Sequence, residues 1–551
     1  MQTSKSYIGE ILIGISLFIV SLFVYSFNLN HGLYVDELYH MLPAHSVLTE
    51  GTLRVANGEY VRVELYTRFI ALLFGIFGES VEVARISSSI TASIFISTVY
   101  FVMSWAVGKK EALLTALVLI VLPSSIYIAQ FIRFYALHQL VFFIGAFGVY
   151  VLATTKLNVL RFTGGLILTV CAIAFSCYLQ ISSLIAFIAI SLWLVIYLTN
   201  QNLNIATRTK LGVRVLLFLL ISGLFVLLFL ILQDTASTLI ASFRWTAPWN
   251  SENTDNYLYY YRLFRYQFSS LWALFPIACI LAIINKPKPA FFFVCVFTVS
   301  LLIFSMGGMK AERYVVFLYP FFIGIWAIVG TLMFSKLRLL IIESFSALPY
   351  LTLSQYAKKQ VANVLLSIAC LFLALSNHVL PTSFHILNGN QYYHEVGDWS
   401  LSNEIVQPLV DSASVVLTTN DVESLYYFKS YDYVFSSFRL NEAAGKTVDE
   451  FVDEFTVDVR TGLPVISKLE SLELILKCYS RGVFLGDEKK WFQDGLGLGK
   501  NGVDLLSKYA KRIELDPRSL LVVFSWESKK LLPKKECQRV YQFKNNLVER
   551  S

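Results

Sequence analysis

Residues 162–200 read FTGGLILTVCAIAFSCYLQISSLIAFIAISLWLVIYLTN and contain no Asp, Glu, Lys or Arg. A helix needs about 20 predominantly apolar residues to cross the hydrocarbon core of a bilayer. The stretch is therefore long enough to cross twice, with a turn near residues 178–183. It predicts a polytopic helical membrane protein, and it excludes both a single-pass anchor and a secreted enzyme.

The composition of the whole chain has the same apolar character. Of its 551 residues, 56% are hydrophobic and 15% are charged, and the mean hydropathy is +0.61, unlike soluble globular domains. The first apolar run lacks a small-residue cleavage site, so we interpret it as a retained helix and not a signal peptide. Apolar runs of about 15 to 25 residues predict about eleven spans, near 8–27, 86–107, 112–131, 134–155, 162–179, 182–199, 215–232, 268–284, 290–305, 315–334 and 361–380.

The distribution of charge predicts the orientation. With the N-terminus in the cytoplasm, the even-numbered connections carry 13 Lys and Arg residues against two acids, Glu111 and Glu343, as the positive-inside rule requires. An odd number of spans then places residues 381–551 outside the cell. We therefore expect a multi-pass plasma-membrane protein with an extracytoplasmic C-terminal domain. The net charge of +10 in residues 1–380 and −3 in the tail follows from this topology, so it gives no reason to expect nucleic acid as a partner.

After residue 380 the hydrophobic pattern becomes one of short strands and helices. SLELILKCYS and NGVDLLSKYAKR predict helices between the strands, and such alternation is typical of an α/β domain. The chain is thus divided into a membrane module, 1–380, and an extracytoplasmic α/β domain, 381–551. The predicted strands are 413–420, 431–437, 463–467, 482–486 and 520–526.

The seven Cys residues form no recognisable framework. Five of them lie in apolar runs, where Cys behaves as a small hydrophobe. Cys478 and Cys537 fall in the tail and would form one disulfide only if the tail is extracytoplasmic and the two are close, which the sequence leaves open. There is no CxxC and no His/Cys spacing typical of a metal site, so we expect neither a metal nor a cofactor.

Two adjacent acids follow the first predicted span directly. They lie in YVDELYHMLPAHSVLTEG, 34–51, at the start of a long first external loop predicted over 28–85. One interpretation is that Asp36 and Glu37 favour the positive end of the helix that follows. The other is that one of them is a general base, because adjacent carboxylates at a membrane surface cost desolvation unless they are used.

A second external loop, predicted over 233–267, is dense in aromatic residues. Trp245 and Trp249 belong to this group, together with several Tyr residues. Such a cluster stacks on sugar faces in some sites, and it equally resembles the aromatic belts that mark membrane interfaces. Both interpretations stay open at this point.

The segments around the acid pair resemble a known family. The resemblance covers RVELYTRFIALLFGIFGESVEVARISS (62–88), IRFYAL (132–137), ERYVVFLYP (312–320) and, in the tail, VVLTTN, SLYYFKSYDY and VVFSW. These segments are similar to GT-C glycosyltransferases of the protein O-mannosyltransferase and aminoarabinose-transferase superfamily, the family 39-like enzymes of bacteria and archaea. The resemblance implies a GT-C-like fold with about 11 transmembrane helices.

Members of that family transfer a sugar from a polyprenyl phosphate to an acceptor on the extracytoplasmic face. The resemblance implies that Asp36 is the catalytic base and that Glu37 orients it or raises its pKa. The implied partners are a polyprenyl-phosphate-linked sugar donor, membrane lipids and an acceptor that is a protein, a lipid or a polysaccharide. For the donor phosphate the resemblance implies Arg62, Arg133, Lys310 and Arg313, and candidate substrate contacts are His40, Tyr66, Tyr135, Trp245 and Trp249.

The sequence departs from the family pattern in two places. Many relatives carry His-Pro-Pro or a similar run where this chain has Arg62, Val63 and Glu64. Many also carry an acid in the second external loop, whereas residues 123–135 contain none and Gln130 is the nearest polar substitute. Asp36 is therefore expected to act without a second carboxylate or a metal.

Two other classes of function compete with the enzyme. A lipid or sugar transporter, or a flippase, also needs many spans, but transporters place ionisable groups mid-membrane in repeated halves, and neither feature is present here. A glycan-binding membrane protein would not need the acid pair. Substitution of Asp36 and Glu37 separates that class from the enzyme.

Overall fold

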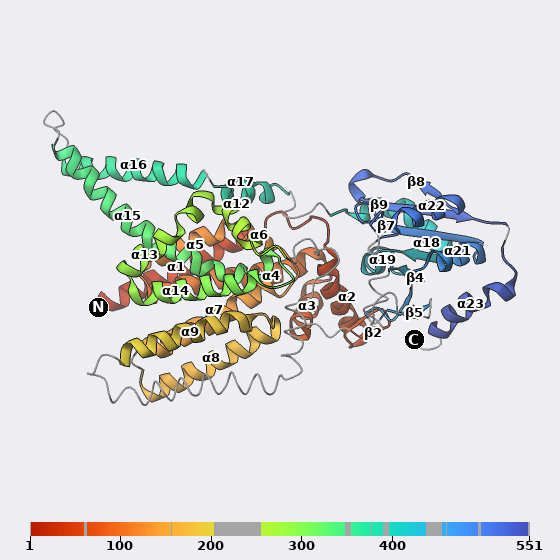
Figure 1. The fold of residues 1–551 in the computed structure, drawn as a ribbon, viewed down its shortest axis with the longest axis horizontal. Coiled ribbons are helices and arrows are strands. Elements are labelled where there is room, and N and C mark those ends of the chain that lie inside the picture. Colours follow the sequence, from red (N-terminus) through yellow and green to blue (C-terminus); the bar gives the residue numbers. More distant parts are fainter. Residues whose placement is uncertain are drawn as a thin grey trace. The chain divides into compact units, whose positions relative to one another are not determined.

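The computed structural model describes residues 2–59, 63–155, 157–202, 255–347, 354–375, 377–389, 396–436, 455–458, 460–493, 497–529 and 531–548 (Figure 1). The chain forms two compact units. One comprises Met1–Asn28 and Ser88–Tyr392, and the other comprises Leu29–Ser87 and Tyr393–Ser551. The first loop therefore packs with the tail, a grouping that the predicted division at residue 380 does not include.

The described residues of the first unit form helices and the connections between them. Apolar side chains drive its formation, and aromatic residues dominate its interior: the ring of Phe147 lies 5.6 Å from that of Phe292 and 6.0 Å from that of Phe321. Its helices are α1 (Gln2–Tyr25), α4 (Val81–Ala106, from Ser88 onward), α5 (Lys109–Ile120), α6 (Pro123–Ala129), α7 (Tyr135–Thr154), α8 (Val159–Leu179), α9 (Ser183–Asn202), α12 (Tyr259–Ala273), α13 (Phe275–Asn285), α14 (Pro287–Ser305), η3 (Glu312–Tyr314), η4 (Val316–Leu318), α15 (Tyr319–Ala347), α16 (Gln355–Leu375) and α17 (Val379–Leu387).

The described residues contain seven helices that are long and apolar enough to cross a membrane, or nine if two bent pairs are counted. The pair α5–α6 bends by 66° and the pair α12–α13 by 56°. A Pro stands in the first turn of α6 and of α13, where its missing N–H and fixed φ end the preceding helix and start the next.

The predicted polytopic fold is confirmed, and the part of the chain that the structure describes holds seven to nine of the roughly eleven predicted spans. The quoted stretch forms α8 and α9, which meet between Leu179 and Ser183 as expected. The predicted span 215–232 lies outside the described residues, and the span 361–380 falls on α16, which is not among the candidates. The protein is a multi-pass membrane protein.

The tail forms a seven-stranded sheet in the order β5-β6-β4-β3-β7-β9-β8. The four strands from β6 to β7 are parallel, and the remaining strands join antiparallel. All five predicted strands are confirmed, whereas the short edge strands β5 and β8 carry too little pattern to be found. The strands are β3 (Val415–Thr418), β4 (Tyr433–Phe435), β5 (Thr456–Val457), β6 (Pro464–Ile466), β7 (Arg481–Asp487), β8 (Lys511–Ile513) and β9 (Leu521–Glu527).

Helices cover both faces of this sheet, so its central strands are apolar on both sides. On β3, Val415 and Leu417 belong to one core and Val416 to the other, which is the alternation of an extended strand. The first core contains side chains of α21 (Leu469–Cys478), α22 (Gly499–Tyr509) and α23 (Lys534–Val548), and the second contains those of α18 (Asn403–Ser412) and α19 (Asp421–Phe428). The predicted α/β domain is confirmed.

The first loop adds two helices and a hairpin to the second unit. Its elements are α2 (Val35–Glu50), β1 (Arg54–Val55), β2 (Gly58–Glu59) and α3 (Glu64–Phe77), followed by the first turns of α4. Helix α2 packs against α3 and against α19 of the tail. One side of α3 stays apolar and exposed, with Leu72 at 59% and Phe77 at 70%, as in helices that lie along a membrane interface.

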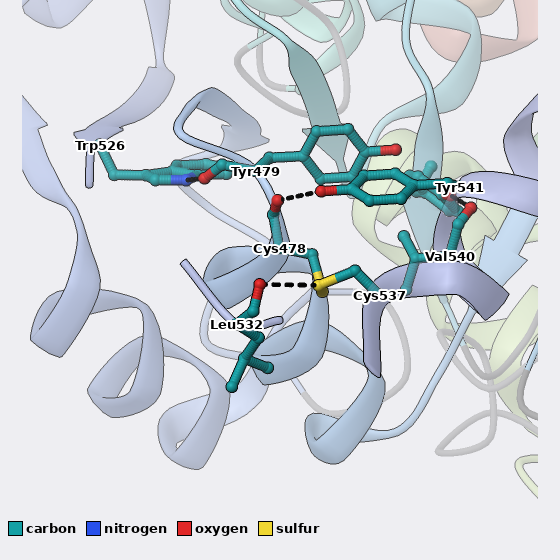
Figure 2. Close-up of a disulfide and its surroundings, with 8 residues drawn as sticks. Cys478, Tyr479, Trp526, Leu532, Cys537, Val540 and Tyr541 are labelled. Atoms are coloured by element: carbon teal, nitrogen blue, oxygen red, sulfur yellow. Dashed lines mark hydrogen bonds between the residues drawn. A yellow bond between two sulfur atoms is a disulfide. The ribbon is translucent and has the colours of Figure 1, made fainter. Parts of the chain in front are cut away.

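Cys478 and Cys537 form a disulfide that joins α21 to α23, with 5.5 Å between their Cα atoms (Figure 2). The Tyr541 hydroxyl donates to the carbonyl of Cys478 at 2.5 Å, and the Tyr433 hydroxyl donates to the carbonyl of Val540 at 3.0 Å. The pairing that the sequence left open is therefore present. Disulfides persist in oxidising compartments, and the extracytoplasmic side of the tail stays a prediction.

Cys478→Ser should lower the free energy of unfolding of the tail. The bridge spans a sequence separation of 59 residues, and loop-closure entropy gives an upper value of about 4 kcal/mol. Thermal melting of the purified protein should show a lower transition temperature for Cys478→Ser than for wild type. Cys171→Ser, which removes a free, exposed thiol, should leave the transition temperature unchanged. Equal melting curves and alkylation of both tail cysteines in the untreated protein would contradict the pairing.

Candidate active site

The acid pair lies in the first turn of helix α2, and the two carboxylates differ in their burial. The Tyr34 N–H donates to Glu37 Oε2 at 3.0 Å, so the third helical residue caps the helix. Successive helical residues point about 100° apart. As a result the Glu37 side chain is fully buried, whereas Asp36 is only partly buried.

Glu37 is held by a bidentate ion pair with Arg85 of α4. Arg85 Nε donates to Oε1 at 3.0 Å and Nη2 donates to Oε2 at 2.8 Å, and neither side chain is exposed. Arg85 also donates to the carbonyls of Leu29, His31 and Gly32 at 2.5 to 3.1 Å. One guanidinium therefore fixes both the start of α2 and the segment that leads into it.

Arg85 is the partner of the acid pair that the sequence analysis did not single out. It lies in VARISS, inside the segment that carries the family resemblance. The available signal was a cation at the start of an apolar span, which needs a buried partner. The adjacent acids of the first loop supply that partner.

His31 lies next to this ion pair and stays neutral at neutral pH. Its burial, and then the positive charge of Arg85, lower the pKa of the His31 imidazole to about 4. A second cation beside Arg85 would compete for Glu37. Because the pKa is lowered, that cation appears only in acid, well below neutral pH.

His40 and Tyr66, two candidate substrate contacts, lie in the packing between α2 and α3. His40 Nδ1 is 2.8 Å from Thr67 Oγ1, and its ring meets the Tyr66 ring edge-on at 5.0 Å. Both side chains are buried. Their contacts with each other hold α3 against the helix that carries Asp36.

In the first unit, a polar corner precedes Arg133. Gln130 donates to the carbonyls of Phe27 at 2.6 Å and Tyr25 at 3.3 Å, so the residue nearest to the missing acid ties the corner to the end of α1. The Ser88 hydroxyl donates to the carbonyl of Phe131 at 2.8 Å. These bonds fix the backbone from which Arg133 extends.

Arg133 and Tyr135 follow this corner at the start of α7. The Arg133 side chain is buried, with its guanidinium 5.8 Å from the Phe134 ring centroid. The Tyr135 ring stacks on Phe131 at 6.4 Å. A buried cation at a helix start is expensive unless polar or anionic groups meet it.

A second cation-bearing segment connects α14 to α15. The Lys310 ammonium donates to the carbonyl of Gly307 and lies 5.8 Å from the Tyr257 ring centroid. Burial lowers the pKa of Lys310 below its ordinary value. The Arg313 guanidinium lies 5.3 Å from the Tyr314 ring centroid.

Glu312 holds this segment in place. Its carboxylate is buried and accepts from Gln267 Nε2 at 2.8 Å and from the Tyr319 hydroxyl at 2.7 Å. The Tyr260 hydroxyl donates to the carbonyl of Ala311 at 3.2 Å. Four polar side chains of α12, η3 and α15 therefore position the two cations.

The structure brings part of the predicted site together. Helix α6 contacts η3, and the His138 ring meets Phe317 at 5.0 Å, so Arg133 and Arg313 belong to neighbouring segments. Asp36, Glu37, His40 and Tyr66 gather on α2 and α3. Arg62, Trp245 and Trp249 lie outside the described residues. Within the described ranges no group of three or more His, Cys, Asp and Glu side chains could hold a metal.

The fold is the GT-C-like fold that the resemblance in the sequence implies. The chain is similar to ArnT from Cupriavidus metallidurans in the apo state, with TM-score 0.59 and 15% identity over 96% of this chain and 100% of that one. The ArnT structure bound to undecaprenyl phosphate gives TM-score 0.57 and 14% identity, over 95% and 99% of the two chains.

A second relative in structure is the archaeal oligosaccharyltransferase AglB from Archaeoglobus fulgidus, in complex with an inhibitory peptide and a dolichol-phosphate. Its TM-score is 0.52 at 11% identity, over 94% of this chain and 75% of that one. The comparisons with family models and with curated proteins found no match to the sequence. At these identities the likeness is one of fold.

Arg85→Ala should destabilise the protein by about 3 to 5 kcal/mol, because it leaves the Glu37 carboxylate buried without its cation. Replacing both, as Arg85→Met with Glu37→Leu, should recover part of that loss. Thermal melting of the purified variants measures the difference.

The matched control is Arg68→Ala, which breaks the Arg68–Glu64 pair at 2.7 Å, where both side chains are about half exposed (48% and 49%). Exposed pairs contribute about 0 to 1 kcal/mol. Similar losses of stability for Arg68→Ala and Arg85→Ala would show that the buried pair matters no more to stability than an exposed pair.

Proposed function

We propose that this protein is a membrane glycosyltransferase that moves a sugar from a polyprenyl-phosphate donor to an acceptor hydroxyl or similar nucleophile. The observation that carries the proposal is the different burial of the two acids. Glu37 is enclosed with Arg85, and Asp36 is partly exposed on the same turn. The fold adds support, since ArnT is bound to undecaprenyl phosphate and AglB to a dolichol-phosphate in their structures.

The chemistry is a direct displacement. The acceptor oxygen forms a bond to the anomeric carbon of the sugar while the bond from that carbon to the phosphate oxygen breaks, and the acceptor proton passes to the Asp36 carboxylate. The polyprenyl phosphate leaves with the electron pair. The configuration of the anomeric carbon inverts, because attack and departure occur on opposite sides.

Cations stabilise the departing phosphate. Arg133, Lys310 and Arg313 are the described candidates, and Arg62 is a further one from the sequence. Arginine suits this role because its planar fork binds phosphate oxygens in pairs. Glu37 acts by orienting the first turn of α2 and not by accepting the proton.

The remaining assignments follow from this scheme. Tyr135, His40 and Tyr66 would shape the sugar site, and Trp245 and Trp249 would stack on substrate. The site and the disulfide-bonded tail would face outward from the plasma membrane, with the N-terminus in the cytoplasm. The acceptor belongs to one of three classes, protein, lipid or polysaccharide.

A transporter is less well supported. The two bent helix pairs resemble the broken helices on which transporters build their sites. However, residues 112–132 and 266–285, which contain the two breaks, have no Asp, Glu, Lys or Arg. A coupling site at these breaks would lack the ionisable groups that it needs.

Asp36→Asn should abolish transfer and leave folding intact, because an amide keeps the shape of the carboxylate but cannot accept a proton. We expect kcat to fall by about 100-fold or more in an assay that offers undecaprenyl-phosphate hexoses and pentoses with membrane extract as acceptor. Glu50→Gln, at the exposed end of the same helix, is the matched control. Turnover by Asp36→Asn at the wild-type rate would remove Asp36 from the mechanism.

Activity should survive chelators. The described residues offer no cluster for a divalent ion, and one acid pair with one member already in an ion pair supplies too few ligands for such a site. Transfer measured after EDTA treatment should match the untreated rate. Loss of activity that Mg²⁺ or Mn²⁺ restores would contradict a metal-independent reaction.

A further inference from the structure

The turn between β5 and β6 is built to present one arginine. Asp458 is buried, and its carboxylate accepts the backbone N–H of Arg460 at 3.0 Å and the Thr461 hydroxyl at 3.2 Å. The N–H of Gly462 donates to the carbonyl of Asp458 at 2.8 Å, and Gly462 has a φ of +66°. The left-handed residue and the buried carboxylate fix the turn locally.

This turn packs directly on the first loop. The Asn57 N–H donates to the carbonyl of Thr461 at 2.9 Å. A Cβ added to Gly58 would lie 2.2 Å from the Arg460 carbonyl oxygen, so the two backbones are as close as glycine allows. The hairpin β1–β2 therefore contacts the turn through its backbone.

The Arg460 side chain reaches helix α2. Its Nη1 donates to the Tyr39 hydroxyl at 3.1 Å, and its guanidinium lies 5.4 Å from the centroid of the Tyr39 ring. Tyr39 is buried and stands three residues after Asp36. Residues at this spacing lie on the same side of a helix, so Arg460 contacts the side of α2 that carries the proposed base.

Helix α2 is thus restrained twice. Arg85 holds its first turn through Glu37, and Arg460 holds the following turn through Tyr39. Helix α19 of the tail packs against α2 as well. A restraint from the tail on the Asp36 helix has no role in packing the sheet of the tail itself, which raises the question of what it does.

We propose that Arg460 is a positioning residue: through Tyr39 it fixes the direction in which α2 presents Asp36, and the tail thereby sets the rate of transfer. The inference rests on the proposed function. A displacement of about 1 Å in a reacting group can cost roughly 100-fold in rate. We expect donor binding to depend little on this restraint, because Arg133, Lys310 and Arg313, the described candidates for its phosphate, belong to other segments.

Arg460→Ala should lower kcat by about 10- to 100-fold and change the KM for the undecaprenyl-phosphate donor by less than about twofold. Arg460→Lys, which keeps the charge over the Tyr39 ring, should restore part of the rate. Tyr39→Phe removes only the hydroxyl, and its kcat should lie between those of Arg460→Ala and Arg460→Lys. Arg512→Ala, which removes an exposed tail arginine paired with Glu488, is the matched control and should behave as wild type.

Hydrogen exchange of residues 35–50 in the substrate-free protein gives a readout that needs no activity. Exchange in this helix should be faster in Arg460→Ala than in wild type or Arg512→Ala, with the tail sheet unchanged. Wild-type kcat or wild-type exchange in Arg460→Ala would overturn the proposal, and so would a uniform rise in exchange across the tail. If the wild type transfers no sugar, the proposed function fails, and the exchange comparison still decides whether Arg460 restrains α2.

Discussion

A buried ion pair between Glu37 and Arg85 is the constraint on which the candidate site depends. Both side chains are fully enclosed, and the Arg85 guanidinium also binds three carbonyls of the segment before α2. Buried pairs do not by themselves add much stability, but removing one partner is costly, so they favour one arrangement over others. Here the favoured arrangement separates two adjacent carboxylates: Glu37 is enclosed in the ion pair, and Asp36, the proposed base, is partly exposed.

Much of this could be read from the sequence. Long uncharged runs predicted the membrane helices, because hydrocarbon accepts little else. Short apolar runs at β3, β4, β6, β7 and β9, with helical segments between some of them, predicted the tail sheet. The enclosure of Glu37 in an ion pair could not be predicted, because its partner Arg85 is 48 residues away in the chain. The packing of the tail on the first loop could not be predicted either. The residues around Gly58, Tyr39 and Arg460 contain no local sequence pattern that indicates their contact.

Buried polar side chains also fix the cation-bearing segments. Gln130 and Glu312 are buried side chains that bind backbone or neighbouring polar groups and hold the segments of Arg133 and Arg313. Polar residues in an apolar surrounding are costly unless satisfied, so each one present marks a place where backbone geometry matters. In this chain those places adjoin the residues proposed to meet the donor phosphate.

Under the proposed function, the protein binds a polyprenyl-phosphate donor with these cations. Native mass spectrometry of the purified protein, incubated with undecaprenyl phosphate and with phosphatidylglycerol at equal concentration, tests it most directly. We predict one tightly retained undecaprenyl phosphate per chain, lost in the variant that combines Arg133→Gln with Arg313→Gln. Retention of phosphatidylglycerol in its place, or equal retention of undecaprenyl phosphate by that variant, would contradict the claim.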